Sequence, residues 1–279
     1  MKKFIVFPFV AIIIISCQSK LIPSSDTEQI QNLSNAATQI ALTGSARQTA
    51  TQAVEQTATQ SALYLLNPQT PTPTAIDINN ETATILFRDD FDKLLQPGWQ
   101  WTNEIPENWS LIENPGDLQI NVVGGYVNLQ NASNMLTVPA RQGDFYIETS
   151  LLFDPDTDNQ FAGLIMYESD NEYIQTGASY CSPINGCIGK GLYIDIYQEG
   201  NLLLPRTAID FIQDRLAIRM VHYTGKIVFY ASLDGKVWYR ISDFATDINV
   251  SRVGLITGQS IADLPKPALF EYFEIGTLK

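Results

Sequence analysis

Two tyrosines flank a carboxylate in a segment that alternates apolar and polar residues, 191–199. Such alternation is typical of a strand with one buried face, and the other face would here carry Tyr193, Asp195 and Tyr197. Tyrosine rings stack on the C–H faces of sugars, and a carboxylate accepts hydrogen bonds from hydroxyl groups. This face is therefore suited to a flat, hydroxyl-rich ligand.

A second polar pair comes from a hairpin whose register can be derived. Thr224 and Gly225 form a two-residue turn between two apolar runs. Counting outward from this turn places Arg219 opposite Tyr230, and the residues on either side of each are apolar. We predict that this strand and the hairpin present one wet, glycan-binding face, made of Tyr193, Asp195, Tyr197, Arg219 and Tyr230. A tyrosine-rich packing surface covered by a loop is the alternative.

Two cysteines lie close together in a loop that contains proline and glycine. Cys181 and Cys187 are separated by five residues, and in an exported protein we expect them to form a disulfide. Two free thiols are the alternative, which requires the loop to hold the two Cα atoms more than ~7 Å apart.

Residues 1–16 have the pattern of a secretory signal, in which Lys2 and Lys3 precede the apolar stretch 4–15. This stretch is shorter than the ~20 residues that a membrane-spanning helix needs. Its end, Ile14-Ile15-Ser16-Cys17, resembles a bacterial lipobox. The resemblance implies cleavage before Cys17 and acylation of that cysteine, with palmitate or a similar chain. The protein would then be anchored to a lipid bilayer of the cell envelope, with its domain outside the cytoplasm. An ordinary signal peptide with an incidental cysteine is the alternative.

Charge and composition exclude several classes of function. The 279 residues include 17 Lys and Arg against 30 Asp and Glu, a net charge of −13. Nucleic-acid binding calls for a basic surface, so this class is excluded. One histidine and three cysteines are too few for a histidine-rich metal site or a zinc module with four cysteines.

Between the anchor and the domain, residues 17–83 are interpreted as a stalk and linker. The segment 18–80 contains one aromatic residue, Tyr64, and cannot build a core. Its Ala-, Thr- and Gln-rich part, 36–62, favours helix in places, whereas the Pro-Thr run 68–74 is stiff and extended. Such a stalk would lift the following domain off the lipid.

The remaining residues, 84–279, predict one all-β domain. Short alternating segments are separated by Gly, Asn, Asp and Pro, and no stretch shows a convincing helical period. This organisation is typical of a β-sandwich or barrel.

Several motifs in this domain resemble the concanavalin A-like module at the C-terminus of family-43 β-xylosidases. In chain order they are Phe87-Arg-Asp-Asp-Phe91, Pro97-Gly-Trp-Gln-Trp101, Trp109, Gln160-Phe-Ala-Gly-Leu-Ile165, Asn171-Glu-Tyr-Ile174, Ser232-Leu-Asp-Gly-Lys-Val-Trp238 and Phe270-Glu-Tyr-Phe273. The resemblance covers about residues 85–276 and implies a two-sheet jelly roll with a concave and a convex face. Nothing before residue 84 could fold into the catalytic domain of that family.

A structural calcium ion is a further candidate. In many jelly rolls the first and last strands are neighbours, which would bring Asp89 or Asp90 close to Glu271 or Glu274. We take Asp90 and Glu271 as the candidate ligands and expect no other cofactor.

No catalytic residue can be assigned. The lectin-like family-16 glucanases carry Glu-x-Asp-x-x-Glu on their active strand, but here Tyr193 stands at the nucleophile's place and Glu199 lies one residue too late. His222, the single histidine, falls on the core side of the hairpin. The sequence therefore predicts a surface-displayed lipoprotein with a non-catalytic carbohydrate-binding module. A glycoside hydrolase or polysaccharide lyase using carboxylates of the concave face, and a structural envelope protein, are the alternatives.

Overall fold

The computed structural model describes residues 74–76, 84–185, 187–203, 207–210, 215–258 and 265–277. All of them belong to the second of two compact units of the chain, Thr70–Lys279. The predicted signal peptide, Cys17 and most of the predicted stalk lie outside the described residues. Within the described segments, no helix is long and apolar enough to cross a membrane.

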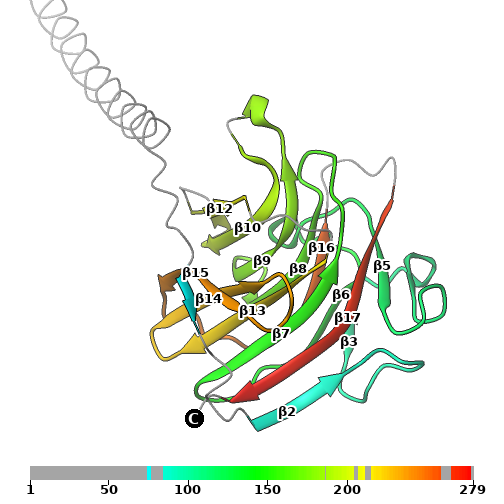
Figure 1. The fold of residues 1–279 in the computed structure, drawn as a ribbon, viewed down its shortest axis with the longest axis horizontal. Coiled ribbons are helices and arrows are strands. Elements are labelled where there is room, and N and C mark those ends of the chain that lie inside the picture. The colour runs from blue at the N-terminus through cyan, green and yellow to red at the C-terminus, as the bar shows by residue number, and fades with distance from the viewer. Residues whose placement is uncertain are drawn as a thin grey trace, which may run out of the picture. The chain divides into compact units, whose positions relative to one another are not determined.

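Two antiparallel sheets make up the described part of the domain (Figure 1). Sheet A contains, in spatial order, β1 (Thr74–Ile76), β15 (Trp238–Ala245), β14 (Lys226–Ser232), β13 (Arg215–Tyr223), β7 (Phe145–Leu152), β17 (Lys266–Thr277), β5 (Leu118–Val122) and β4 (Trp109–Ser110), with β2 (Thr84–Asp89) also paired to β17. Sheet B contains β11 (Asn201–Leu202), β10 (Gly189–Gln198), β9 (Glu172–Cys181), β8 (Phe161–Ser169), β16 (Arg252–Gly258), β6 (Met135–Pro139) and β3 (Gln100–Thr102), with β12 (Thr207–Ile209) also paired to β10. Short 3-10 helices lie in the connections, namely η2 (Pro106–Asn108), η3 (Val127–Leu129) and η4 (Pro183–Asn185).

This architecture confirms the predicted all-β, two-sheet jelly roll. The predicted pairing of the first and last strands of the domain is also present, because β2 lies against β17. Strand β1 comes from the segment that we interpreted as stalk and linker, and it pairs with β15 at the edge of sheet A.

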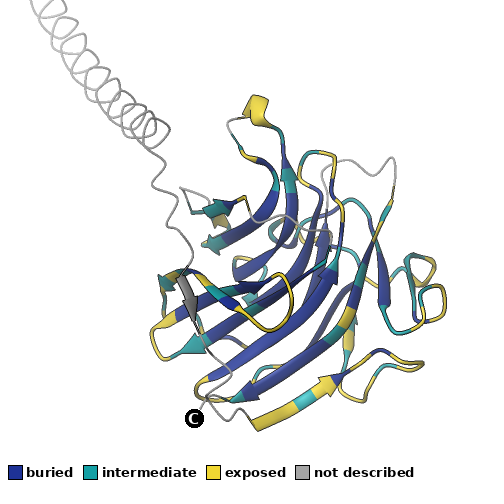
Figure 2. Ribbon diagram, viewed as in Figure 1, coloured by how far each residue is buried: buried dark blue, intermediate teal, exposed yellow. Residues whose placement is uncertain are grey.

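The main core fills the space between the two sheets. Leu192 and Ile194 reach it from sheet B, and Ile218 and Met220 reach it from sheet A. Since side chains alternate along a strand, the residues between them point outward, on opposite sides of the sandwich. The central strands are buried along most of their length, whereas β2 and many loops are exposed (Figure 2).

A buried carboxylate explains the motif near the start of the domain. Asp89 is 1% exposed and accepts hydrogen bonds from the backbone N–H groups of Phe91 (3.0 Å) and Gln96 (2.7 Å) and from the Trp99 indole (2.8 Å). These bonds hold the turn after β2, in which Phe91 has a φ of 52°. Trp99 in turn packs on Phe273 of the last strand, with 4.9 Å between the ring centroids.

The predicted hairpin register is confirmed. Arg219 pairs with Tyr230, and His222 pairs with Ile227, across β13 and β14. The imidazole of His222 stacks on the ring of Phe145, with centroids 5.0 Å apart. His222 is therefore a packed residue at the rim of the core.

The predicted disulfide between Cys181 and Cys187 is also present, with 5.5 Å between the two Cα atoms. It closes the loop at the tip of the β9–β10 hairpin, which projects at the top of Figure 1. The Asp158 carboxylate, which is not part of this loop, also holds the loop in place, because it accepts hydrogen bonds from Ser182 N and from Asn185 Nδ2.

Candidate functional site

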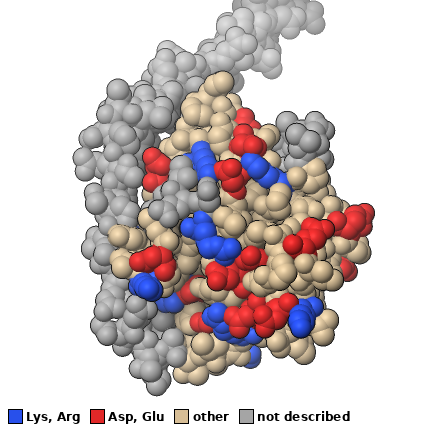
Figure 3. Space-filling view, turned by 45° about the vertical axis from the view of Figure 1, so that its right-hand side comes forward, with Lys and Arg blue, Asp and Glu red and all other residues tan. Residues whose placement is uncertain are grey.

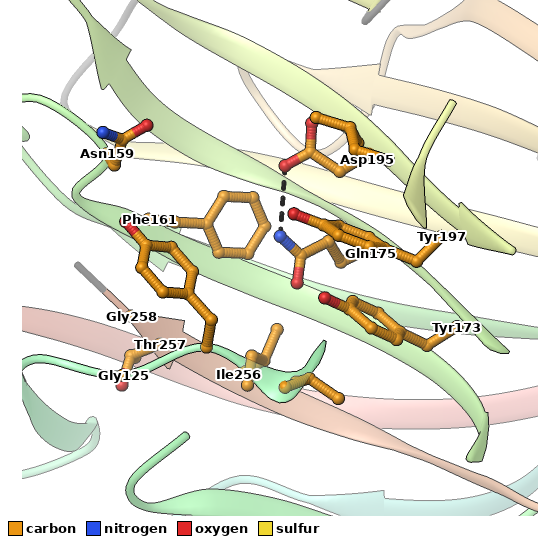
Figure 4. Close-up of a pocket in the computed structure, with 13 residues that line it drawn as sticks. Gly125, Asn159, Phe161, Tyr173, Gln175, Asp195, Tyr197, Ile256, Thr257 and Gly258 are labelled. Carbon is orange, nitrogen blue, oxygen red and sulfur yellow. Dashed lines mark hydrogen bonds between the residues drawn. The ribbon is translucent and has the colours of Figure 1, made fainter. Parts of the chain in front are cut away.

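A pocket of about 80 Å³ opens on the outward face of sheet B (Figure 4). A volume of this size has room for several water molecules or for part of one sugar ring, and it is small beside the ~300–1,000 Å³ of typical ligand sites. Strands β8, β9, β10 and β16 supply most of its lining, and the rest comes from the β5–β6 connection, the loop before β8 and strand β11. The lining residues are Gly125, Tyr126, Val127, Asn159, Phe161, Tyr173, Gln175, Asp195, Tyr197, Leu202, Ile256, Thr257 and Gly258.

The polar and aromatic groups of the pocket are positioned by the β9–β10 register. Tyr197 lies opposite Tyr173, and Asp195 lies opposite Gln175, on the same outward face. The two tyrosine rings stack with centroids 4.4 Å apart and planes 13° from parallel. Gln175 Nε2 donates a 3.1 Å hydrogen bond to Asp195 Oδ2, as the dashed line in Figure 4 shows. The pocket thus combines an aromatic stack with a carboxylate–amide pair, both of which suit sugar hydroxyls and C–H faces.

The connection between β5 and β6 forms one wall of the pocket. Val127 and Ala132 of this connection pack on Phe161, Ile165 and Ile256 of sheet B in a second apolar cluster, separate from the main core. Gly125 has a φ of +130°, and a Cβ atom there would lie only 2.1 Å from the backbone oxygen of Asn131. The loop can therefore close over the sheet only with glycine at this position.

Burial raises the pKa of one tyrosine in the pocket and of one beside it. Desolvation, and to a lesser degree the neighbouring Tyr197, raises the pKa of Tyr173 far above its ordinary value. Desolvation also raises the pKa of Tyr167, on the neighbouring strand β8, to about 12, and its hydrogen bond to Asp170 acts in the same direction. Both side chains are phenols at physiological pH, and the Tyr167 phenol donates its hydrogen to Asp170.

A family comparison bears directly on this fold and site. Residues 88–275 match the model of the beta xylosidase C-terminal concanavalin A-like domain. The chain belongs to this family. A comparison with curated proteins found no match.

Solved structures similar to this family member contain the same sandwich within longer chains. The GH43 protein BlXynB from Bacillus licheniformis aligns with a TM-score of 0.62 and 22% identity over 67% of this chain and 38% of that one. The xylan beta-1,4-xylosidase from Bacillus halodurans C-125 aligns with a TM-score of 0.57 and 19% identity over 67% and 38% of the two chains. The GH43B protein of the Bacteroides ovatus xyloglucan locus aligns with a TM-score of 0.58 and 17% identity over 68% and 39%. The chain thus spans less than half the length of these proteins, and the likeness shows the fold.

In this concanavalin A-like domain, the prediction that five residues share one face is wrong. Tyr193, Asp195 and Tyr197 lie on the outward face of sheet B, whereas Arg219 and Tyr230 lie on the outward face of sheet A. The main core separates the two faces. Alternation assigns the two faces of each strand correctly, but it carries no information about which sheet a strand joins. Tyr193 also differs in exposure: it is fully buried, and its hydroxyl donates to the backbone oxygen of Gly189 (2.7 Å).

Arg219 and Tyr230 instead belong to a row of side chains that crosses six strands of sheet A. The directly opposite residues are, in order, Arg240, Tyr230, Arg219, Glu148, Glu274 and Arg88. The two central glutamates would repel each other, but each has an arginine on its other side. Arg219 binds Glu148 and Arg88 binds Glu274 (2.6 Å), so both glutamates have their counter-charge within the row. Across the visible face of the molecule, acidic and basic groups likewise lie side by side (Figure 3).

Tyrosines complete the hydrogen bonding of this row. The Tyr272 hydroxyl donates a hydrogen bond to Glu148, and the Tyr146 hydroxyl donates one to Glu274. The donor–acceptor distance is 2.5 Å in both. Burial raises the pKa of Glu148, although the charge of Arg219 acts in the opposite direction. All polar groups of these two glutamates therefore face partners within the protein, and we assign this row a structural role.

The candidate calcium ligands are engaged by arginines. Asp90 forms an ion pair with Arg88 (2.7 Å), and Glu271 forms one with Arg215 (2.9 Å). No group of three or more His, Cys, Asp and Glu side chains that could hold a metal ion occurs among the described residues. The calcium site stays a prediction.

Several residues of the pocket were not predicted as site residues. Tyr173 and Gln175 fall in a segment that the sequence predicts as a strand, but the sequence does not define its register against 191–199. Phe161 belongs to the motif that begins at Gln160. The alternation of aromatic and polar residues at 173 and 175 repeats that at 195 and 197 and is the signal that could have found them.

Proposed function

We propose that the protein is a lipoprotein displayed on the cell envelope whose concanavalin A-like domain binds carbohydrate without catalysing a reaction. The observation that carries this proposal is the pocket on sheet B, where the stacked Tyr173 and Tyr197 adjoin the Asp195–Gln175 pair. The names of the similar solved structures include enzymes that act on xylan, which supports a plant-type polysaccharide as the class of ligand.

The pocket supports binding over hydrolysis. Glycoside hydrolases of the usual kind need two carboxylates about 5–10 Å apart, one of them as an acid. Among the described lining residues Asp195 is the sole carboxylate, and it accepts a hydrogen bond from Gln175. The paired glutamates of the domain, Glu148 and Glu274, lie on the other sheet and are buried.

We expect Tyr197→Ala to weaken glycan binding about tenfold, because loss of one stacking ring typically removes about 1–2 kcal/mol of binding free energy. Glycan-array screening of the purified protein would identify a ligand, and calorimetric titration would give the affinities. The matched control is Tyr230→Ala, which removes a half-buried tyrosine from the outward face of sheet A and should leave the affinity unchanged.

Three results would contradict the proposal. They are failure of the wild type to bind any glycan, equal losses in Tyr197→Ala and Tyr230→Ala, and release of reducing ends from a bound polysaccharide. The last would favour a hydrolase, and the first would favour a structural envelope protein. Thermal unfolding of both variants separates a loss of binding from a loss of fold.

The envelope location rests on the lipobox-like end of the predicted signal, Ile14-Ile15-Ser16-Cys17. We expect metabolic labelling with a fatty-acid probe to mark the wild type and not Cys17→Ser, because the thiol of Cys17 is the acceptor. Equal labelling of both proteins would be incompatible with anchoring through this residue. Fractionation of membranes would then show whether the labelled protein is retained in the inner or outer membrane.

A further inference from the structure

Asn159 places an amide in the pocket on the outward face of sheet B (the sheet B pocket). The residue lies just before β8, lines the pocket and is exposed to solvent. Its side chain makes no hydrogen bond within the part of the chain that the structure describes. In Figure 4, Asn159 lies at one end of the pocket, and Tyr173 and Tyr197 lie at the other. The two polar atoms of this amide are therefore open to a ligand, whereas Gln175 and Asp195 bind each other.

The backbone at Asn159 is fixed from both sides. Its φ of 64° lies in the left-handed region, which asparagine tolerates better than most residues, and its N–H donates to the backbone oxygen of Tyr180 (2.8 Å). On one side, the Asp158 carboxylate accepts a hydrogen bond from Ser182 N in the disulfide-closed loop. On the other side, the buried Gln160 side chain accepts two backbone hydrogen bonds from the same turn. The turn is therefore held by its neighbours, while the amide of Asn159 itself is left for another partner.

A second exposed amide shows which of these features is particular to the pocket. Gln130 also has a left-handed backbone, with a φ of 57°, and its N–H also closes a turn, by donating to Val127 O (2.8 Å). Its side chain does not line the sheet B pocket. Backbone conformation and exposure are therefore shared by the two residues, and the position in the pocket distinguishes Asn159.

The volume of the pocket limits how much of a ligand can enter. At about 80 Å³ it is roughly half of a ~150 Å³ cavity that encloses a benzene ring. The wall over β16 lies close to the sheet, because a Cβ atom on Gly258 would come within 2.7 Å of Gly125 O. A sugar ring is at least as large as benzene, so the pocket takes the edge of one sugar unit, and the rest of the ligand stays outside. The edge of the ring is the part that carries the hydroxyl groups.

The chemistry of the amide matches two neighbouring hydroxyls of a neutral sugar. Asn159 Oδ1 accepts a hydrogen bond from one hydroxyl, and Nδ2 donates one to the oxygen of the next. Asp195 lines the same pocket, and the chain carries a net charge of −13, so both disfavour an acidic sugar.

We propose that Asn159 determines the specificity of the sheet B pocket by binding two adjacent, unsubstituted hydroxyls on the edge of one neutral sugar unit. The pocket thus selects a glycan by a free pair of neighbouring hydroxyls rather than by a charge. This inference rests on the proposed carbohydrate-binding function and specifies the chemical class of its ligand.

The test compares ligands that differ by one hydroxyl. The probes are xylobiose and cellobiose, each beside a set of analogues that lack one hydroxyl in turn, so that no bulk is added. Calorimetric titration of the full protein should show about 3- to 10-fold weaker binding of the analogues that lack either of two adjacent hydroxyls, the effect of one neutral hydrogen bond in each case. Removal of hydroxyls elsewhere on the same sugar unit should have less effect.

Matched glycine variants assign this preference to one residue. Asn159→Gly removes the amide but keeps the left-handed backbone, which glycine adopts freely. It should weaken binding of the unmodified probe about 10- to 100-fold, the effect of two hydrogen bonds, and should abolish the dependence on the two adjacent hydroxyls. Gln130→Gly makes the same change at an exposed left-handed position outside the pocket and should alter neither the affinity nor the hydroxyl dependence. Thermal unfolding should show similar stability in the two variants.

The outcomes separate this inference from the function on which it rests. Wild-type binding that depends on no pair of adjacent hydroxyls would overturn the role of Asn159 while the carbohydrate-binding function stands. A hydroxyl dependence that survives in Asn159→Gly, or an equal loss of affinity in Gln130→Gly, would also overturn it. Failure of the wild type to bind either disaccharide would overturn the inference, and an empty glycan array would overturn the proposed function as well.

Discussion

Replacing Arg219 by alanine should lower the free energy of unfolding by about 3–5 kcal/mol, because it leaves the buried carboxylate of Glu148 without its counter-charge. The Arg219 and Glu148 side chains are 12% and 9% exposed, and Arg219 Nε donates a 2.5 Å hydrogen bond to Glu148 Oε2. The guanidinium also lies between the rings of Tyr146 and Trp238, 4.5 Å and 4.6 Å from their centroids. Alanine would therefore remove packing as well as charge. Chemical denaturation at neutral pH measures this loss.

The double variant Arg219→Met/Glu148→Leu provides the matched control. An ion pair replaced as a whole by apolar side chains of similar size is often close to neutral, whereas removal of one partner is not. We therefore expect the double variant to be much more stable than Arg219→Ala. If the single and double variants lost the same stability, packing of the arginine stem would account for the effect and the charge argument would fail.

The pH dependence of Arg219→Ala gives a further check with a definite sign. Burial already raises the pKa of Glu148 in the folded protein, and loss of the neighbouring cation raises that pKa further. A carboxyl group whose pKa is higher in the folded than in the unfolded state destabilises the fold while it is ionised. The destabilisation is relieved as the pH falls through the folded pKa toward the ordinary value of 4.5. The gap in stability between the variant and the wild type should therefore narrow on mild acidification.

The alternation of apolar and polar residues explains which parts of the binding face could be predicted from the sequence. Alternation assigns side chains to the two faces of a strand, which is why the outward position of Asp195 and the pairing of Arg219 with Tyr230 are confirmed. The chain passes from sheet B to sheet A between β10 and β13, and no periodicity marks this passage. Two residues that both point outward can therefore lie on opposite sides of the core.

The rest of the pocket depends on contacts that are distant in sequence. Gln175 meets Asp195 through the β9–β10 register, in which Cys181, at the end of the disulfide-closed loop, pairs with Gly189. The loop that carries Gly125 has no periodicity, so its closure over sheet B follows from backbone geometry rather than from a hydrophobic pattern. The resemblance of short motifs in the correct order predicted the fold better than any of these local signals, since it reflects the whole domain.

Asp89→Ala is expected to destabilise the domain by about 3–5 kcal/mol. The carboxylate accepts hydrogen bonds from Phe91 N, Gln96 N and Trp99 Nε1, and hydrogen bonds to a charged group each contribute about 1.5–3 kcal/mol, with part of the loss recovered through water. Alanine leaves these three N–H groups unsatisfied at a site where Asp89 is 1% exposed. Thermal or denaturant unfolding, followed through tryptophan fluorescence, would measure the loss.

The neighbouring residue is the natural control for this experiment. Asp90 carries the same charge one position later, but its side chain is 58% exposed and its ion pair with Arg88 lies at the surface. Exposed ion pairs contribute about 0–1 kcal/mol, so Asp90→Ala should leave stability almost unchanged. Asp89→Asn keeps one acceptor oxygen and should fall between the two alanine variants. Equal effects of Asp89→Ala and Asp90→Ala would show that charge, rather than the buried hydrogen bonds that join β2 to Trp99 and hence to the last strand, explains the Asp-Asp-Phe motif.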